Sequence, residues 1–185
     1  VACFFKTPST TFISLVTIAC CNSAAAGLIP GPAPWSRDNV DRALLFLDRF
    51  QQKKNQRVSG KQKRDIKLSL SALQSALFNL WIGERIRDGL MDRVLLGDVC
   101  RKVEGGTFYS TEPDIDTIRL QKGEIEVLGP MVGPKLFPAR AEAKAREETL
   151  YQKWGLSDER RNGLGKIWRG DRRPVTLRPQ HLKAN

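Results

Sequence analysis

A long run of regularly spaced apolar residues, between positions 68 and 87, constrains the fold most. Its apolar side chains recur at intervals of three and four, which is the period of an amphipathic α-helix. Gly89 stands just beyond the run, at the place where a glycine commonly ends a helix. The segment therefore predicts a long, buried helix. Its apolar face consists of Leu70, Leu73, Leu77 and Leu80 or Trp81.

Four polar residues interrupt this apolar run. They are Ser71, Gln74, Ser75 and Asn79. Small and amide side chains lower helix propensity, so inside a helix they usually have a hydrogen-bonding or close-packing role. We expect this polar set to be satisfied within the fold.

Shorter helices and strands are expected before and after this helix in the sequence. The predicted fold class is therefore α+β with helices dominant. Further helices are expected from Asp38 or Asn39 through Leu47, over 112–121 with Thr111 as cap and Pro113 in the first turn, over 139–154, and after Ser157. Strands are expected over 93–103 with a break at Gly97-Asp98, over 107–110 after the Gly105-Gly106 turn, over 125–128 and over 175–178.

Two connecting segments also have recognisable composition. Residues 51–67 carry seven basic residues and little apolar content, which predicts an exposed basic connector. Residues 129–135 contain two Gly-Pro pairs, which favour a rigid loop. In the helix expected over 139–154, acidic and basic residues alternate, as on a solvated helix face. The acidic residues of that face are Glu142, Glu147 and Glu148.

The charge of the chain is positive and unevenly distributed. It carries 31 Lys and Arg against 20 Asp and Glu, a formal net charge of +11. Residues 36–67 hold ten basic and four acidic residues, and residues 165–185 hold six and one. Such basic flanks favour nucleic acid, and after it an anionic membrane surface, whereas the alternative is a solvated charge run. The candidate nucleic-acid contacts are Lys53, Lys54, Arg57, Lys61, Lys63, Arg64, Lys67, Lys166, Arg169, Arg172, Arg173 and Arg178.

Residue types restrict the possible chemistry. His181 is the one histidine, so a multi-histidine metal site is excluded and a Ser-His-Asp or Cys-His site would depend on that residue alone. The four cysteines (Cys3, Cys20, Cys21 and Cys100) form no Cys-x-x-Cys pair, which favours free thiols in a reducing compartment. No glycine-rich phosphate-binding motif occurs in the sequence. We therefore predict neither a metal nor a cofactor.

The first 35 residues differ in composition from the rest, with one basic residue and no acidic one. Residues 12–21 are apolar but too short to span a bilayer as a helix. With Lys6 before them and small residues after them, residues 1–26 have the outline of a secretory signal peptide, so secretion is one alternative. The other is a segment foreign to the domain, such as a misread start. Residues 30–34 are rich in proline and predict a linker.

The long helix also contains a recognisable sequence motif. Residues 70–85 resemble the S-A-x-x-S-x-L-F-N-x-x-x-x-x-R motif of TruD-type tRNA pseudouridine synthases. Other family landmarks stand in the expected order along the chain: one before the helix at 38–40, and the rest after it at Gly97-Asp98, 129–135, 172–174 and 178–182. The resemblance covers about residues 36–182 and leaves 183–185 as a tail. We assign a structural role to the motif residues Ser71, Ala72, Gln74, Ser75, Leu77, Phe78, Asn79 and Arg85.

The resemblance implies a cytoplasmic enzyme that isomerises a uridine of tRNA, uridine 13, to pseudouridine without a cofactor. In that family an aspartate attacks, the glycosidic bond breaks, and the base is rejoined through carbon. The target base must be flipped out of its stack. The family combines a pseudouridine synthase core with an inserted domain, and this chain resembles the helix-rich inserted domain with short strands and an incomplete catalytic core.

The departures from the family concern catalysis. The family's G-x-K-D motif, which holds the catalytic aspartate, has no counterpart in residues 1–35, and residues 29–37 differ from its N-[YR]-F-G-x-Q-R-F-G motif. The C-terminal segment with an aromatic at the active site has no counterpart either. We therefore assign no catalytic residue and expect a chain that binds tRNA without catalysis. The alternative is a stand-alone basic RNA-binding module without enzymatic activity.

Overall fold

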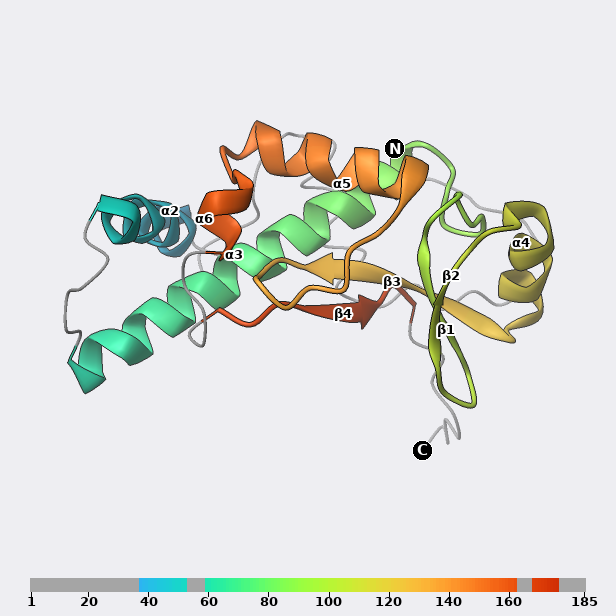
Figure 1. Cartoon of the computed structure of the whole chain (residues 1–185), viewed down its shortest axis with the longest axis horizontal. Helices are drawn as coiled ribbons and strands as arrows, with labels where there is room; N and C mark the ends of the chain where they lie inside the picture. Colours follow the sequence, from blue (N-terminus) through green and yellow to red (C-terminus); the bar gives the residue numbers. More distant parts are fainter. Residues whose placement is uncertain (1–36, 53–58, 163–167, 177–185) are drawn as a thin grey trace, which may run out of the picture.

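The computed structural model describes residues 37–52, 59–162 and 168–176 (Figure 1). Within these ranges, helices and a small antiparallel sheet confirm the predicted α+β class. The expected signal-like and proline-rich segments lie outside the described residues. The elements are α2 (Arg37–Gln52), α3 (Gly60–Arg87), β1 (Val99–Lys102), β2 (Thr107–Tyr109), α4 (Pro113–Lys122), β3 (Ile125–Met131), α5 (Ala141–Lys153), α6 (Asp158–Asn162) and β4 (Asp171–Pro174).

Helix α3 is the long helix of the sequence prediction, but it begins earlier than its apolar run. The Ser59 hydroxyl accepts a hydrogen bond from the Gln62 amide at 3.3 Å, and the Gln62 side-chain oxygen accepts one from the Ser59 amide at 3.0 Å. This reciprocal capping box starts the helix at Gly60. Residues 60–67 are therefore the first turns of a helix, and the prediction of a connector there was wrong.

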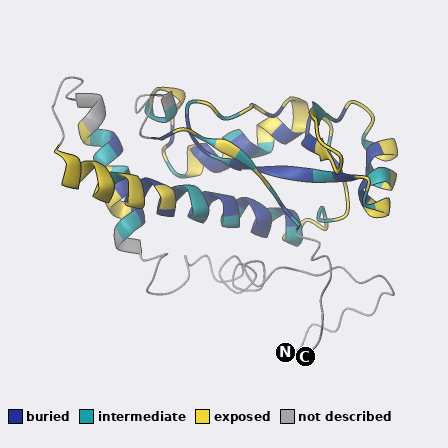
Figure 2. Cartoon of the chain, turned by 90° about the horizontal axis from the view of Figure 1, so that it is seen from below, coloured by how far each residue is buried: buried dark blue, intermediate teal, exposed yellow. Residues whose placement is uncertain are grey.

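The buried face of α3 is the predicted one. Leu70, Leu73, Leu77 and Trp81 are all buried, and Figure 2 shows the change from exposed first turns to a buried body. Gly89 has a φ of 67° and ends the helix as expected, because that left-handed conformation suits glycine. Because apolar and small residues are buried over most of its length, α3 is the core around which the other elements are arranged.

Helix α2 packs against α3 through the apolar positions that the sequence predicted. Val40, Ala43 and Leu47 are buried against the helix. The helix already includes Arg37, so the expected start at Asp38 or Asn39 was wrong.

The sheet has the strand order β2-β1-β3-β4, with every neighbouring pair antiparallel. The turn predicted at Gly105-Gly106 is confirmed, because it joins β1 to β2. The strand expected over 93–103 is shorter, since it starts at Val99, and the last strand is at 171–174 instead of 175–178. Residues 177 and 178 lie outside the described residues.

Strand β3 also differs from the prediction. It runs through Gly129, Pro130 and Met131, which were expected to form a loop, because β4 pairs with that stretch. Gly129 is required at this point: a Cβ there would lie 2.7 Å from the Phe78 ring and 2.8 Å from the Trp81 ring. The glycine lets β3 lie directly on α3.

Two of the shorter helices begin close to where they were expected. In α4 the residue before Pro113 is Glu112, which takes the cap position in place of Thr111 and makes no side-chain cap hydrogen bond. In α6 the Ser157 hydroxyl accepts from the Arg160 amide at 3.3 Å, so the predicted cap is confirmed.

The two faces of the sheet carry separate apolar clusters, since side chains alternate along a strand. Cys100 and Val127 face the large core built on α3. Val99 and Leu128 face a smaller cluster with Ala143 of α5. The sheet is thereby held between α3 and the start of α5. Among the described residues, no helix has the length and apolar character needed to cross a membrane.

Candidate nucleic-acid interface

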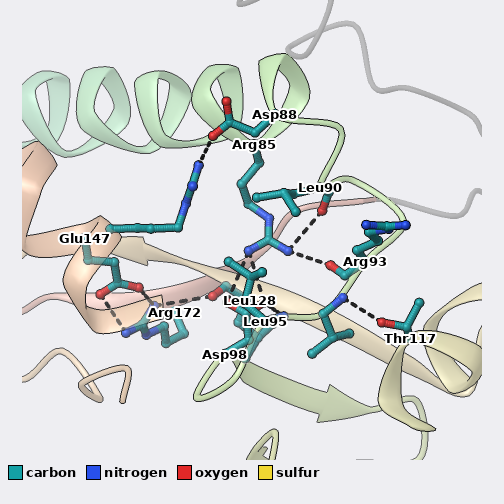
Figure 3. A network of polar contacts seen from close by, with 12 residues as sticks. Arg85, Asp88, Leu90, Arg93, Leu95, Asp98, Thr117, Leu128, Glu147 and Arg172 are labelled. Carbon is teal, nitrogen blue, oxygen red and sulfur yellow. Dashed lines mark hydrogen bonds and ion pairs between the residues drawn. The ribbon is translucent and has the colours of Figure 1, made fainter. Parts of the chain in front are cut away.

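The last motif residue of α3, Arg85, forms a buried ion pair with Asp98 (Figure 3). Its Nη1 lies 3.1 and 3.0 Å from the two carboxylate oxygens, and the two side chains are 2% and 3% exposed. Its Nη2 donates to the carbonyls of Leu90 and Arg93 at 3.0 and 2.7 Å. A buried charge is tolerated only when it is paired and hydrogen-bonded in this way, and every one of these contacts lies inside the fold.

The glycine before Asp98 is needed for the same arrangement. Gly97 has a φ of 82°, and a Cβ there would lie 2.1 Å from the backbone oxygen of Arg140. The Gly97 carbonyl accepts a hydrogen bond from the Arg140 amide at 3.0 Å. The two motifs seen in the sequence, on α3 and at Gly97-Asp98, are therefore brought together by the fold.

The polar residues of the α3 motif have different surroundings. The Gln74 amide donates to the Val132 carbonyl at 2.7 Å, so this side chain is satisfied within the fold as expected. Asn79 Oδ1 is buried and has no hydrogen-bond partner among the described residues, so the expectation of a fully satisfied set was wrong there. Ser71 is exposed and Ser75 is half-buried.

Arg172 was expected to be a surface contact, but its side chain is 5% exposed. Its guanidinium forms an ion pair with Glu147 of α5 at 2.5 Å (Figure 3) and donates to the Phe137 carbonyl at 2.7 Å. Glu147 is equally buried, so the prediction that it lies on a solvated face was also wrong. Burial raises the pKa of the Glu147 carboxyl, and the charge of Arg172 opposes that rise.

Arg173, the next residue, points to the other face of the sheet because side chains alternate along β4. Its guanidinium carbon lies 5.2 Å from the centroid of the Phe78 ring on α3, and the residue is exposed. The ring holds the guanidinium at the surface, where it is available to an anion.

Two lysines extend this basic surface along α3. Lys63 and Lys67 are exposed and lie eleven and seven residues before Gln74, which places both within about 20° of its direction around the helix. Arg64 lies about 80° and Lys61 about 140° from that direction. Lys63 and Lys67 therefore share the side of α3 on which Gln74 contacts Val132, and Lys61 does not.

The segment after β3 adds one cation that the sequence analysis did not select, Lys135. Its amide donates to the Arg169 carbonyl at 2.7 Å, and both side chains are exposed. This approach requires glycine on both sides, since a Cβ on Gly133 would lie 2.4 Å from the Gly170 nitrogen. The sequence shows Gly133 and Gly170, but it does not show that these two glycines approach each other.

We call the resulting surface the α3–β4 basic face. It consists of Lys63, Lys67, Lys135, Arg169 and Arg173. Gln74 and the Phe78–Arg173 contact hold its parts together. The remaining candidates from the sequence lie outside the described residues: Lys53, Lys54, Arg57, Lys166 and Arg178.

Neither a reactive cysteine nor a metal site is supported in the described part of the chain. Burial raises the pKa of the Cys100 thiol to about 12, so the group stays uncharged and unreactive. Within residues 37–52, 59–162 and 168–176, no group of three or more His, Cys, Asp or Glu side chains could hold a metal ion.

Fold and surface together define a basic α+β domain that is held by buried arginine–carboxylate pairs. A family model of tRNA pseudouridine synthase D (TruD) matches residues 51–185 of the chain. The chain belongs to this family, and the resemblance found in its motifs is confirmed.

Individual relatives give the extent of the similarity. tRNA pseudouridine synthase D of Anaeromyxobacter sp. (strain Fw109-5) is 42% identical over 142 residues, which cover 75% of this chain and 39% of the relative. A protein of the same name from Thermus thermophilus is 38% identical over 109 residues, 58% of this chain and 29% of the relative. The chain thus spans about two fifths or less of the length of these curated relatives.

A solved structure supports the fold. A crystal structure of a Methanosarcina mazei protein described as tRNA pseudouridine synthase D (TruD) aligns with a TM-score of 0.53 at 15% identity. The alignment covers 89% of this chain and 49% of that one. At this identity the likeness concerns the fold alone.

Proposed function

We propose that this chain is the RNA-binding part of a tRNA pseudouridine synthase, which isomerises uridine 13 of tRNA in the cytoplasm. Membership of the TruD family supports the reaction class. The observation that carries the RNA-binding role is the α3–β4 basic face, to which three separate segments contribute exposed cations. A surface of this kind neutralises phosphates along a strand.

The geometry of the basic face favours binding over mere solubility. Three contacts hold the backbone and side chains that display the cations: Gln74 to Val132, Lys135 to Arg169, and Arg173 to the Phe78 ring. Charges that only maintain solubility do not require such fixed positions. Preorganised side chains lose less entropy when a ligand binds.

RNA binding is expected to depend steeply on salt. For the chain with unmodified tRNA, the logarithm of the association constant should fall linearly with the logarithm of the salt concentration. Substituting Lys67→Gln or Arg173→Gln should each reduce the magnitude of that slope by about 0.7–0.9, because each removes one phosphate contact. Affinity should fall for all RNA sequences alike, since phosphate contacts position a protein without specifying sequence. Fluorescence anisotropy at several salt concentrations measures both quantities.

Lys61→Gln is the matched control for these variants. It removes the same charge from the same exposed turns of α3 but from another side of the helix, so the slope should be unchanged. Equal effects of Lys61→Gln and Lys67→Gln would assign binding to net charge and not to the basic face. Arg172 is unsuitable for this test because its loss would leave Glu147 buried without its partner.

We further propose that the chain by itself does not catalyse the isomerisation. None of its residues lies in a motif like the family's G-x-K-D, and two aspartates that were considered as substitutes, Asp98 and Asp171, both accept hydrogen bonds within the fold. Asp98 is 3% exposed and paired with Arg85, and an Asp171 oxygen accepts the Arg172 amide at 2.8 Å. Purified chain incubated with unmodified tRNA should form no pseudouridine by a pseudouridine-specific chemical readout. Measurable turnover would contradict the proposal.

The second candidate function is a stand-alone RNA-binding module. It is favoured by the buried pair of Asp98 with Arg85, which leaves that aspartate without access to a substrate. The encoding DNA distinguishes the two. G-x-K-D and Q-R-F-G motifs in another frame upstream of the codon for Ser36 would favour a synthase, and a continuous unrelated frame would favour the module.

A further inference from the structure

A short aromatic stack lies on the side of the sheet opposite to α3. Tyr109 of β2 and Phe137, from the segment between β3 and α5, stack with ring centroids 4.8 Å apart and planes 17° from parallel. The guanidinium carbon of Arg140, the residue before α5, lies 3.9 Å from the centroid of the Tyr109 ring. Three residues that are distant in sequence thus form one cation–aromatic assembly.

Hydrogen bonds and a buried neighbour hold the backbone around Phe137 in place. The Phe137 carbonyl accepts from Arg172 Nε at 2.7 Å, and the Leu136 amide donates to the Gly133 carbonyl at 3.0 Å. Two residues further on, Ala139 is buried in the small cluster below the stack. The buried pair of Arg172 and Glu147 therefore acts as a positioning device for Phe137.

This rigid stack ends in an open aromatic surface. One face of the Phe137 ring is covered by Tyr109, yet 42% of the residue remains exposed. A large exposed ring beside a stacked partner offers apolar surface on which a planar ligand can be buried favourably.

The charges around Phe137 indicate what that ligand is. The segment 132–140 contains two cations, Lys135 and Arg140, both exposed, and no acidic residue. Lys135 also belongs to the α3–β4 basic face, so the segment leads from that face to the stack. Aromatic rings interleaved with cations suit a nucleic-acid strand whose bases stack while its phosphates are neutralised. A purely apolar protein partner would not require the cations.

We propose that the exposed face of Phe137 stacks on an unpaired base of the bound RNA, with Lys135 and Arg140 at the neighbouring phosphates. This deepens the proposed function and rests on it. A base held there lies outside the RNA helix, because both faces of a paired and stacked base are occupied by its neighbours.

The test uses the 185-residue chain and a short single-stranded RNA that carries 2-aminopurine, whose fluorescence falls when it stacks. The unaltered chain should bind the RNA and quench the probe. Phe137→Ala should weaken binding about 5- to 150-fold and abolish the quenching, because stacking on one aromatic ring contributes that much per base. Phe137→Trp should restore both, while Phe137→Leu, which keeps apolar bulk without a π-face, should not.

Ile118→Ala is the matched control, because Ile118 is an exposed apolar residue on α4, at 53%, with no place in the stack. It should leave binding and quenching unchanged. Equal binding by the unaltered chain and Phe137→Ala would overturn the inference and leave RNA binding by the basic face intact. Weak binding by Phe137→Ala that Phe137→Trp does not restore would also overturn it, since the residue would then act through the fold. Absence of RNA binding by the unaltered chain would overturn the proposed function, and the inference with it.

Discussion

Arg85→Met is expected to lower the free energy of unfolding by about 3–5 kcal/mol, because it leaves the Asp98 carboxylate buried without its charge partner. The carbonyls of Leu90 and Arg93 would lose their donor at the same time. Arg85→Lys should recover only part of the loss, since one ammonium group cannot reproduce a planar fork that reaches three residues. Urea unfolding followed by circular dichroism measures the effect.

Arg101→Met is the control for that experiment. Arg101 pairs with Glu126 at 2.7 Å, but its side chain is 44% exposed. Exposed pairs of this kind contribute about 0–1 kcal/mol, so the unfolding midpoint should hardly change. If both variants lost the same stability, the buried pair would have no special role in holding α3 to the sheet.

Leu77→Ala is expected to cost about 2–5 kcal/mol, because it opens a cavity at the centre of the core. Leu77 is 1% exposed and lies among core residues contributed by α2, α3 and α5. Phe78→Ala should have a similar cost and should also remove the ring on which Arg173 rests. Thermal or urea unfolding of each variant provides the measurement.

Leu68→Ala, on the same helix, provides the comparison. Leu68 is 61% exposed, so its truncation removes little buried surface and should change stability by less than about 0.5 kcal/mol. An unchanged midpoint for Leu77→Ala would show that this face of α3 is not buried, contrary to the structure.

Features that depend on local sequence were predictable. The apolar period of α3 identified its buried face. Gly89 identified the end of that helix, and Gly105-Gly106 identified the hairpin between β1 and β2. Each of these rests on residues within a few positions of one another, where backbone preferences and side-chain period act directly. The ordered motifs on α3 and at Gly97-Asp98 likewise sufficed to identify the family.

Features that depend on distant partners were not predictable in the same way. Arg172 and Arg173 are indistinguishable as surface cations in the sequence. In β4, however, Arg172 points toward Glu147 and Arg173 points toward Phe78. Glu147 was assigned to solvent because its own helix is highly charged, yet the fold buries it and places Arg172 of β4 beside it.

The sequence by itself determined the family, the fold class, the central helix and the surplus of positive charge, because motif order, period and composition are properties of the chain alone. The tertiary structure decided which cations are exposed, which is buried, and that Tyr109, Phe137 and Arg140 meet in one stack. The physical reason is that burial and pairing depend on which segments the sheet register brings together. That register is fixed by packing between β3, β4 and α3, over contacts that no local pattern encodes.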